Sequence, residues 1–156
     1  HYGIEEFCAR AAEVGMDGLI LPDVPFEEKE EFAGPCRAHG MDLISMIAPT
    51  SEERIDTIAR DAEGFIYCVS SLGVTGTRSS ITTDLDSIVA RIRAVTDTPI
   101  AIGFGISNPE QAAIMAAKSD GAIVGSAIVK IIAAEGENAV LAVGEFARKM
   151  VEAVRA

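Results

Sequence analysis

The chain has 156 residues, of which 49% are hydrophobic, and it carries a formal net charge of −11. That length can bury one core of ordinary size, so a single domain over residues 1–156 is expected. The sequence contains no cluster of Lys and Arg, which argues against nucleic acid or an anionic membrane as a partner. It also contains neither an apolar run long enough for a membrane span nor a signal-peptide pattern, so we expect a cytoplasmic protein.

Cysteine and histidine offer little for metal or nucleophilic chemistry. Cys8, Cys36 and Cys68 are widely spaced in apolar surroundings and form no C-x-x-C pair, so reduced core thiols are predicted rather than a redox or metal role. His39 is one of two histidines and precedes Gly40, which is typical of an ordinary helix stop. Neither a metal site nor a histidine-based triad is expected.

The elements alternate along the chain. The first is a helix from Gly3 to about Val14, which indicates a start in mid-fold because a barrel would place a strand before it. Apolar runs that are rich in Ile, Val and Leu then predict buried parallel strands with apolar residues on both faces. The predicted strands are Gly18–Leu21, Leu43–Ile47, Phe65–Val69, Ile100–Ile102 and Ala122–Val124.

Helix start signals lie between the predicted strands. Thr50 and Glu53 have capping-box spacing, Thr83 and Asp86 form a weaker version, and residues 107–110 place a cap and a proline at a helix start. The alternation fits either an open doubly wound sheet or a barrel. A complete (β/α)8 TIM barrel takes about 250 residues, so the barrel reading gives this chain about the last five βα units.

Both architectures place functional loops at the carboxyl ends of the strands. Gly103 and Gly105 end one strand, and Gly125 with Ser126 ends the next. Glycines there allow backbone N–H groups to approach an anion, and a barrel commonly builds its phosphate site after its last two strands. Tight strand-to-helix turns would explain a single such end. Two successive ends favour a phosphate site that needs neither Lys nor Arg.

Other strand-end residues are open to more than one interpretation. The loop 70–78 predicts either a lid over substrate or an ordinary surface loop. Asp23 is a lone carboxylate near the mouth of the site, which would orient a group or cap a turn but cannot supply an acid and base pair. Apolar residues near the strand ends would line a flat hydrophobic pocket or simply fill the core, with Tyr67 and Phe104 the better pocket candidates. These residues are Ile20, Met46, Tyr67, Phe104 and Ile123.

Four motifs together carry a family resemblance. They are Gly18–Pro25 with the following Glu27 and Glu28, then Gly73–Gly76, Gly103–Ser107 and Val124–Val129. In this order and spacing, over essentially all 156 residues, the chain resembles the tryptophan synthase alpha subunit. Each motif alone is weakly specific, whereas the ordered set is strongly specific.

The resemblance implies a (β/α)8 lyase that cleaves indole-3-glycerol phosphate to indole and glyceraldehyde 3-phosphate without metal or cofactor. It implies a mobile lid containing Gly73, Thr75 and Gly76, in which Thr75 hydrogen-bonds a catalytic aspartate. The implied phosphate ligands are Gly76, Phe104, Gly105, Gly125 and Ser126. The implied indole pocket is lined by Ile20, Met46, Tyr67, Phe104 and Ile123.

The same resemblance implies that no catalytic residue lies in this chain, because the family's glutamate and aspartate belong to the second and third barrel segments. The chain alone is therefore expected to be inactive, and docking to a beta subunit is expected of the full-length protein. One alternative is another phosphate-binding barrel enzyme, such as a sugar-phosphate isomerase or synthase. A second is a non-catalytic half-barrel that self-associates through open strand edges.

Overall fold

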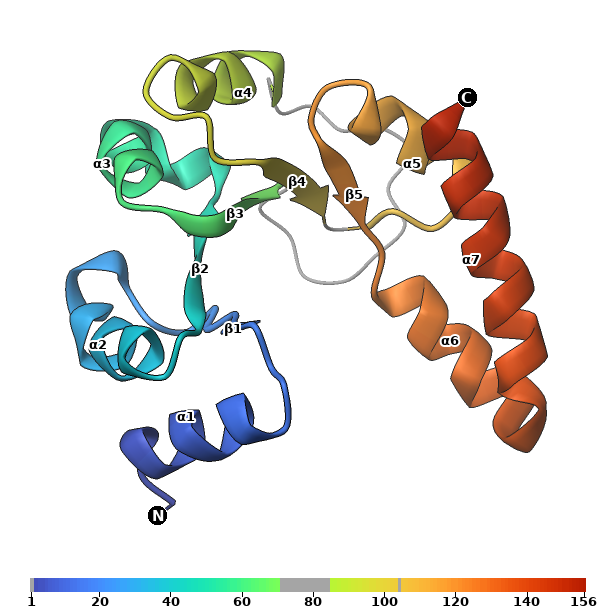
Figure 1. The fold of residues 1–156 in the computed structure, drawn as a ribbon. Helices are drawn as coiled ribbons and strands as arrows, with labels where there is room; N and C mark the ends of the chain where they lie inside the picture. The colour runs from blue at the N-terminus through green and yellow to red at the C-terminus, as the bar shows by residue number, and fades with distance from the viewer. Residues whose placement is uncertain (1, 71–84, 104) are drawn as a thin grey trace.

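The computed structural model describes residues 2–70, 85–103 and 105–156 and shows a parallel sheet with helices packed against it (Figure 1). The strands are β1 (Gly18–Leu19), β2 (Asp42–Ile47), β3 (Glu63–Val69), β4 (Ile100–Gly103) and β5 (Gly121–Ile123). The α-helices are α1 (Ile4–Glu13), α2 (Glu30–Ala38), α3 (Ile55–Arg60), α4 (Leu85–Arg93), α5 (Pro109–Ala116), α6 (Ser126–Glu135) and α7 (Ala139–Arg155). Short 3-10 helices are η1 (Phe26–Glu28), η2 (Pro49–Arg54) and η3 (Gly136–Asn138).

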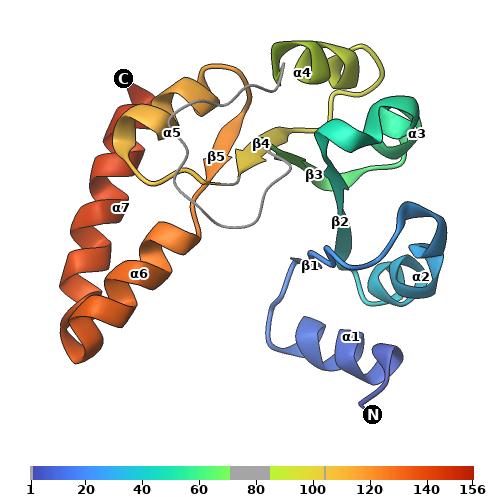
Figure 2. The ribbon, with the colours of Figure 1, turned by 180° about the vertical axis from the view of Figure 1, so that it is seen from behind.

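The order of the strands distinguishes the two candidate architectures. All pairings are parallel, and the spatial order β1-β2-β3-β4-β5 follows the chain. A doubly wound sheet would reverse its order at a switch point, whereas a barrel adds each strand beside the previous one. The sheet is curved, with the helices outside it and the chain termini at opposite ends of the arc (Figures 1 and 2). The predicted barrel segment is therefore confirmed.

The two faces of the sheet differ in burial. In β2 the residues Leu43, Ser45 and Ile47 are buried against the helices, while the alternating Ile44 and Met46 are half-buried. The expectation that the strands are buried on both faces was therefore wrong for the inner face. The reason is geometric, because an arc of five strands does not close around its own interior.

Apolar packing divides the chain into two cores. The larger core lies between β2–β5 and the helices that follow them. The smaller core joins α1, β1, α2 and the start of β2 and contains Cys8, Ala11, Leu19, Ala33, Cys36, Met41 and Leu43. The larger core contains Ile47, Ile55, Ile58, Ala59, Ile66, Cys68, Leu85, Ile88, Val89, Ile92, Ile100, Ile102, Ile106, Ala112, Met115 and Met150.

The helix start signals had mixed outcomes. Asn108 caps α5 as predicted, because its Oδ1 accepts a hydrogen bond from the Gln111 N–H at 2.9 Å. The capping box at Thr50 and Glu53 was wrong, since both residues lie inside η2. There the Ala48 N–H donates to the Ser51 hydroxyl at 3.3 Å instead. Of the signal at Thr83 and Asp86, Thr83 lies outside the described residues and Asp86 lies in the first turn of α4.

The observed bounds of the elements agree with the predicted ones in some cases and differ in others. The first helix is bounded by Gly3 and Val14 as expected. The first strand is shorter than Gly18–Leu21 because the chain turns early, with the Val24 N–H bonded to the Leu21 carbonyl at 3.2 Å. Among the described residues, no helix is long and apolar enough to cross a membrane.

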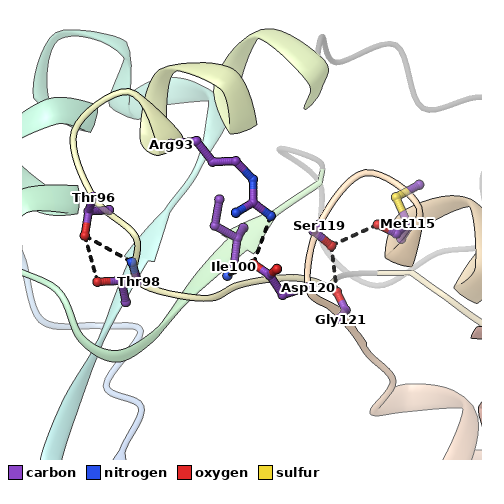
Figure 3. Close-up of polar contacts among 8 residues, drawn as sticks. All are labelled: Arg93, Thr96, Thr98, Ile100, Met115, Ser119, Asp120 and Gly121. Atoms are coloured by element: carbon purple, nitrogen blue, oxygen red, sulfur yellow. Dashed lines mark hydrogen bonds and ion pairs between the residues drawn. The ribbon is translucent and has the colours of Figure 1, made fainter.

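A polar cluster joins β4 and β5 at their amino ends (Figure 3). Asp120 Oδ2 accepts hydrogen bonds from the Ile100 N–H at 2.8 Å and from Arg93 Nη2 at 3.0 Å. In return, the Asp120 N–H donates to the Ile100 carbonyl at 2.9 Å. The hydrogen bond from the Ile100 N–H, assisted by the Arg93 guanidinium, holds the pKa of Asp120 below its usual value. The cluster fixes the pairing of these strands at the end opposite to the candidate site.

We expect Asp120→Ala to lower the free energy of unfolding by about 1 kcal/mol, because the Ile100 N–H loses its partner. Asp120→Asn should cost less, because it keeps an acceptor and loses a solvent-exposed ion pair. Because the folded-state pKa is lowered, the charge-dependent stability is present above the unfolded-state pKa and disappears as pH falls through the folded value. Urea unfolding from pH 7 to pH 3 should show the wild type and Asp120→Asn converging, and a constant gap would contradict this assignment.

Candidate functional site

The carboxyl ends of β3, β4 and β5 lie side by side. Val69 pairs in register with Gly103, and Gly103 pairs with Ile123. The Ser70 N–H donates to the Gly103 carbonyl at 3.0 Å, which extends this alignment one residue beyond β3. Residues that follow these strands are therefore delivered to one edge of the sheet, where functional loops of parallel sheets gather.

The inner face of the sheet brings together part of the predicted indole pocket. Met46 and Tyr67 are register partners on β2 and β3, and both side chains are half-buried. Burial raises the pKa of Tyr67, so its phenol stays neutral at neutral pH. Ile123 is half-buried at the end of β5, whereas Ile20 follows β1 and is 43% exposed. Several other predicted residues lie outside the described residues, namely Gly73, Thr75, Gly76 and Phe104.

Gly103 has a packing role that sequence reasoning did not find. A Cβ atom at this position would lie 2.5 Å from Tyr67 Cε2 and 2.7 Å from the Tyr67 hydroxyl oxygen. The ring of Tyr67 therefore crosses from β3 over the backbone of β4. The sequence predicts that Gly103 allows an anion to approach the backbone, and that role stays a prediction. The structure shows in addition that the missing side chain makes room for the tyrosine ring.

Gly105 takes a backbone conformation that favours glycine. Its φ angle is +81°, and a Cβ atom there would meet nothing within 4 Å. The constraint at this position is therefore the backbone and not space. The exposed Gly105 is followed by the buried Ile106, which anchors the strand end in the larger core.

The start of α5 uses its polar groups internally. Gln111 Oε1 accepts from the Ser107 N–H at 2.9 Å and lies 3.2 Å from the Ser107 hydroxyl. Ser107 is therefore committed to its own helix. Sequence reasoning missed Gln111, although its position three residues after the Asn108 cap is where a capping-box partner stands.

The start of α6 presents exposed backbone donors. Gly125 and Ser126 are both exposed, and the first hydrogen bond of the helix runs from the Val129 N–H to the Gly125 carbonyl at 3.1 Å. The N–H groups of residues 126–128 precede that bond and lie at the positive end of the helix dipole. The N-cap residue is Gly125, which has no side chain to cap this helix. The geometry suits an anion held by backbone groups.

The described residues of this edge include one carboxylate that the sequence singles out. Asp23 is exposed beyond β1. In the described part of the chain, no three His, Cys, Asp or Glu residues are grouped so as to hold a metal ion. A cavity of about 60 Å³ lies beside Leu21, Lys29 and Met46. It is far smaller than the several hundred cubic ångströms typical of a small-molecule site.

Parallel strands in chain order, with helices outside and glycine-bearing ends at one edge, define a segment of a (β/α)8 barrel. The family model for the tryptophan synthase alpha chain matches residues 1–155. The chain therefore belongs to the tryptophan synthase alpha-chain family.

Individual members of the family are similar to this chain in sequence and in structure. The tryptophan synthase alpha chain of Alkaliphilus metalliredigens is 46% identical over 153 residues, which are 97% of this chain and 58% of the relative. A Mycobacterium tuberculosis tryptophan synthase structure matches with a TM-score of 0.85 and 35% identity, covering 99% of this chain and 58% of the other. A structure from the Pyrococcus furiosus tryptophan synthase α2β2 complex matches with a TM-score of 0.82 and 31% identity, covering 96% and 61%. The chain thus spans about three-fifths of the length of these relatives.

We expect Gly103→Ala to destabilise the fold by about 1–3 kcal/mol, because the new methyl group overlaps the Tyr67 ring. Replacing Tyr67 by leucine should cost at least about 1 kcal/mol less in the Gly103→Ala background than in the wild type, because it removes the clash. The measurement is a double-mutant cycle in urea.

Gly121→Ala is the matched control for this cycle. It also lies in a strand of the sheet, but a Cβ atom there would meet nothing within 4 Å. Its coupling to Tyr67→Leu should be close to zero. Equal coupling for both glycines would show that the ring does not rest on Gly103.

Proposed function

We propose that this chain holds the phosphate of indole-3-glycerol phosphate in a tryptophan synthase alpha subunit. The observation that carries this proposal is the meeting of two glycine-bearing strand ends at one edge, through the register of Gly103 with Ile123. Gly105 leaves its backbone uncovered at one end, and the exposed N–H groups at Ser126 open α6 at the other. Gly76 and Phe104 complete the proposed phosphate site.

A neutral site suits this ligand in an acidic protein. The chain carries a net charge of −11, so a phosphate approaches against an unfavourable overall field. Backbone donors and the dipole of α6 supply local positive potential without a counter-charge from Lys or Arg. Such a site selects for phosphate by geometry.

The indole ring of the substrate is assigned to the inner face of the sheet. Met46 and Tyr67 supply adjacent apolar surface there, and Tyr67 contributes a neutral aromatic ring. Ile20, Phe104 and Ile123 line the rest of the proposed pocket. The lid of Gly73, Thr75 and Gly76 closes over the ligand and excludes water.

Catalysis requires groups from outside this chain. Cleavage of the substrate needs proton transfer to the indole ring and removal of a proton from the substrate. At the described strand ends Asp23 is a lone exposed carboxylate, which cannot serve both roles. We therefore assign the acid and base to the part of the relatives' length that this chain does not span. The assembled protein is a cytoplasmic lyase that works with a beta subunit, as the α2β2 assembly of the Pyrococcus furiosus relative supports.

The phosphate site is tested by two alanine variants with glycerol 3-phosphate as the probe, followed by ³¹P NMR. Gly125→Ala should weaken binding by about tenfold while changing stability by less than about 0.5 kcal/mol, because its φ of −118° is ordinary and its Cβ meets nothing. Gly105→Ala should weaken binding and also cost about 1–3 kcal/mol of stability, because φ is positive.

The control for these variants is Gly34→Ala in α2, where a Cβ atom also meets nothing. It should leave binding unchanged and slightly stabilise the helix. Wild-type affinity in Gly125→Ala would remove the start of α6 from the phosphate site.

The activity is tested by an indole-release assay with indole-3-glycerol phosphate. The chain alone should release no indole, and adding the amino-terminal two-fifths of the Alkaliphilus metalliredigens relative should produce activity. Activity from the chain alone would overturn the placement of the acid and base. A stable assembly that binds glycerol 3-phosphate but releases no indole would favour a different phosphate-binding barrel enzyme, and self-association of the chain without assembly would favour the half-barrel alternative.

A further inference from the structure

Two of the three cysteines meet inside the smaller core. Cys8 Sγ on α1 lies 3.8 Å from Cys36 Sγ on α2, and both residues are 0% exposed. They are separated by 28 positions in sequence, so their contact could not be seen from spacing. Cys68 lies in the larger core. All three cysteines are free thiols, as the sequence analysis predicted.

We propose that Cys8 and Cys36 form a reversible disulfide that clamps α1 to α2 when the protein meets an oxidising small-molecule disulfide. The two sulfur atoms are already in contact, so closing the bond requires a small inward movement of α1 and no rearrangement of the sheet. The segment closed by this bond contains β1, Ile20 and Asp23.

The reaction follows ordinary thiol–disulfide exchange. One cysteine thiolate attacks the small disulfide, forming a mixed disulfide and releasing one small thiolate. The second cysteine thiolate then attacks the protein sulfur of that mixed disulfide and releases the second small thiolate. In total, two cysteine thiols lose two protons and two electrons, and the small disulfide is reduced to two thiols.

Burial controls when this reaction occurs. It raises the pKa of the Cys36 thiol to about 11, with a further contribution from the adjacent Cys8, so little thiolate exists while the core is closed. The first attack therefore takes place when α1 lifts from α2. A mixed disulfide leaves no room for the helix to return, because both cysteines are fully buried. The second attack expels the small thiolate, and α1 then returns to its place against α2.

The smaller core is suited to such local opening. It is separate from the larger core, and α1 contributes two fully packed residues to it, Cys8 and Ala11, with Ile4 and Ala12 partly buried beside them. The strand that contributes Leu19 to this core, β1, is two residues long. A segment with few buried contacts opens more readily than the rest of a domain. A disulfide would restrict this opening by linking α1 covalently to α2.

The test is incubation of the whole chain in glutathione buffers of increasing oxidised fraction, followed by alkylation of the remaining thiols and peptide mass spectrometry. We expect one intramolecular Cys8–Cys36 linkage with Cys68 still alkylated. Cys68→Ala should form the same linkage, and Cys8→Ala should not form it. A wild-type chain that retains three alkylatable thiols, or that accumulates glutathione on Cys36, would overturn the proposal.

Hydrogen exchange tests whether the disulfide restricts the opening of α1 or forms without affecting it. Amide exchange in α1 should slow by about tenfold or more on oxidation, while exchange in α4 stays unchanged. The reduced wild type provides the reference, so the comparison needs no substitution in the core. A linkage that leaves exchange in α1 unaltered would refute the clamp.

Discussion

The parallel ladder that runs from β2 to β5 in chain order is the constraint on which the site depends. All of its pairings are parallel, so every strand points the same way and ends at the same edge. The register of Val69, Gly103 and Ile123 then sets which residues are neighbours there. A slip of one residue in β4 would exchange its two faces and remove Gly103 from beneath Tyr67.

The two ends of this ladder have different roles: contacts at the amino ends stabilise the sheet, and groups at the carboxyl ends form the proposed site. At the amino ends, Asp120 ties β4 to β5 through backbone and ionic partners (Figure 3). At the carboxyl ends, polar backbone groups are exposed near Gly105 and Gly125. Backbone N–H groups without a protein partner cost little free energy at a solvated edge, because water bonds them. The same groups can bind an anion. The hydrogen bonds at the amino ends therefore hold β4 and β5 in the register on which the proposed site at the carboxyl ends depends.

Much of the fold followed from local patterns in the sequence. Apolar runs located β2 to β5, and Asn108 before Pro109 located the start of α5, because those signals depend on neighbours in the chain. Contacts between distant residues could not be predicted in this way. The ring of Tyr67 over Gly103 and the meeting of Cys8 with Cys36 depend on how strands and helices are placed in space. The half-buried inner face was also missed, because apolar composition does not reveal what covers a residue.

The close approach of Tyr67 to Gly103 also limits how this family can diverge in sequence. A side chain at position 103 and an aromatic ring at position 67 compete for one volume beside β4. Substitution at position 103 should therefore persist through evolution in lineages where residue 67 has already become smaller. The two positions, 36 residues apart in the chain, should be inherited as a pair.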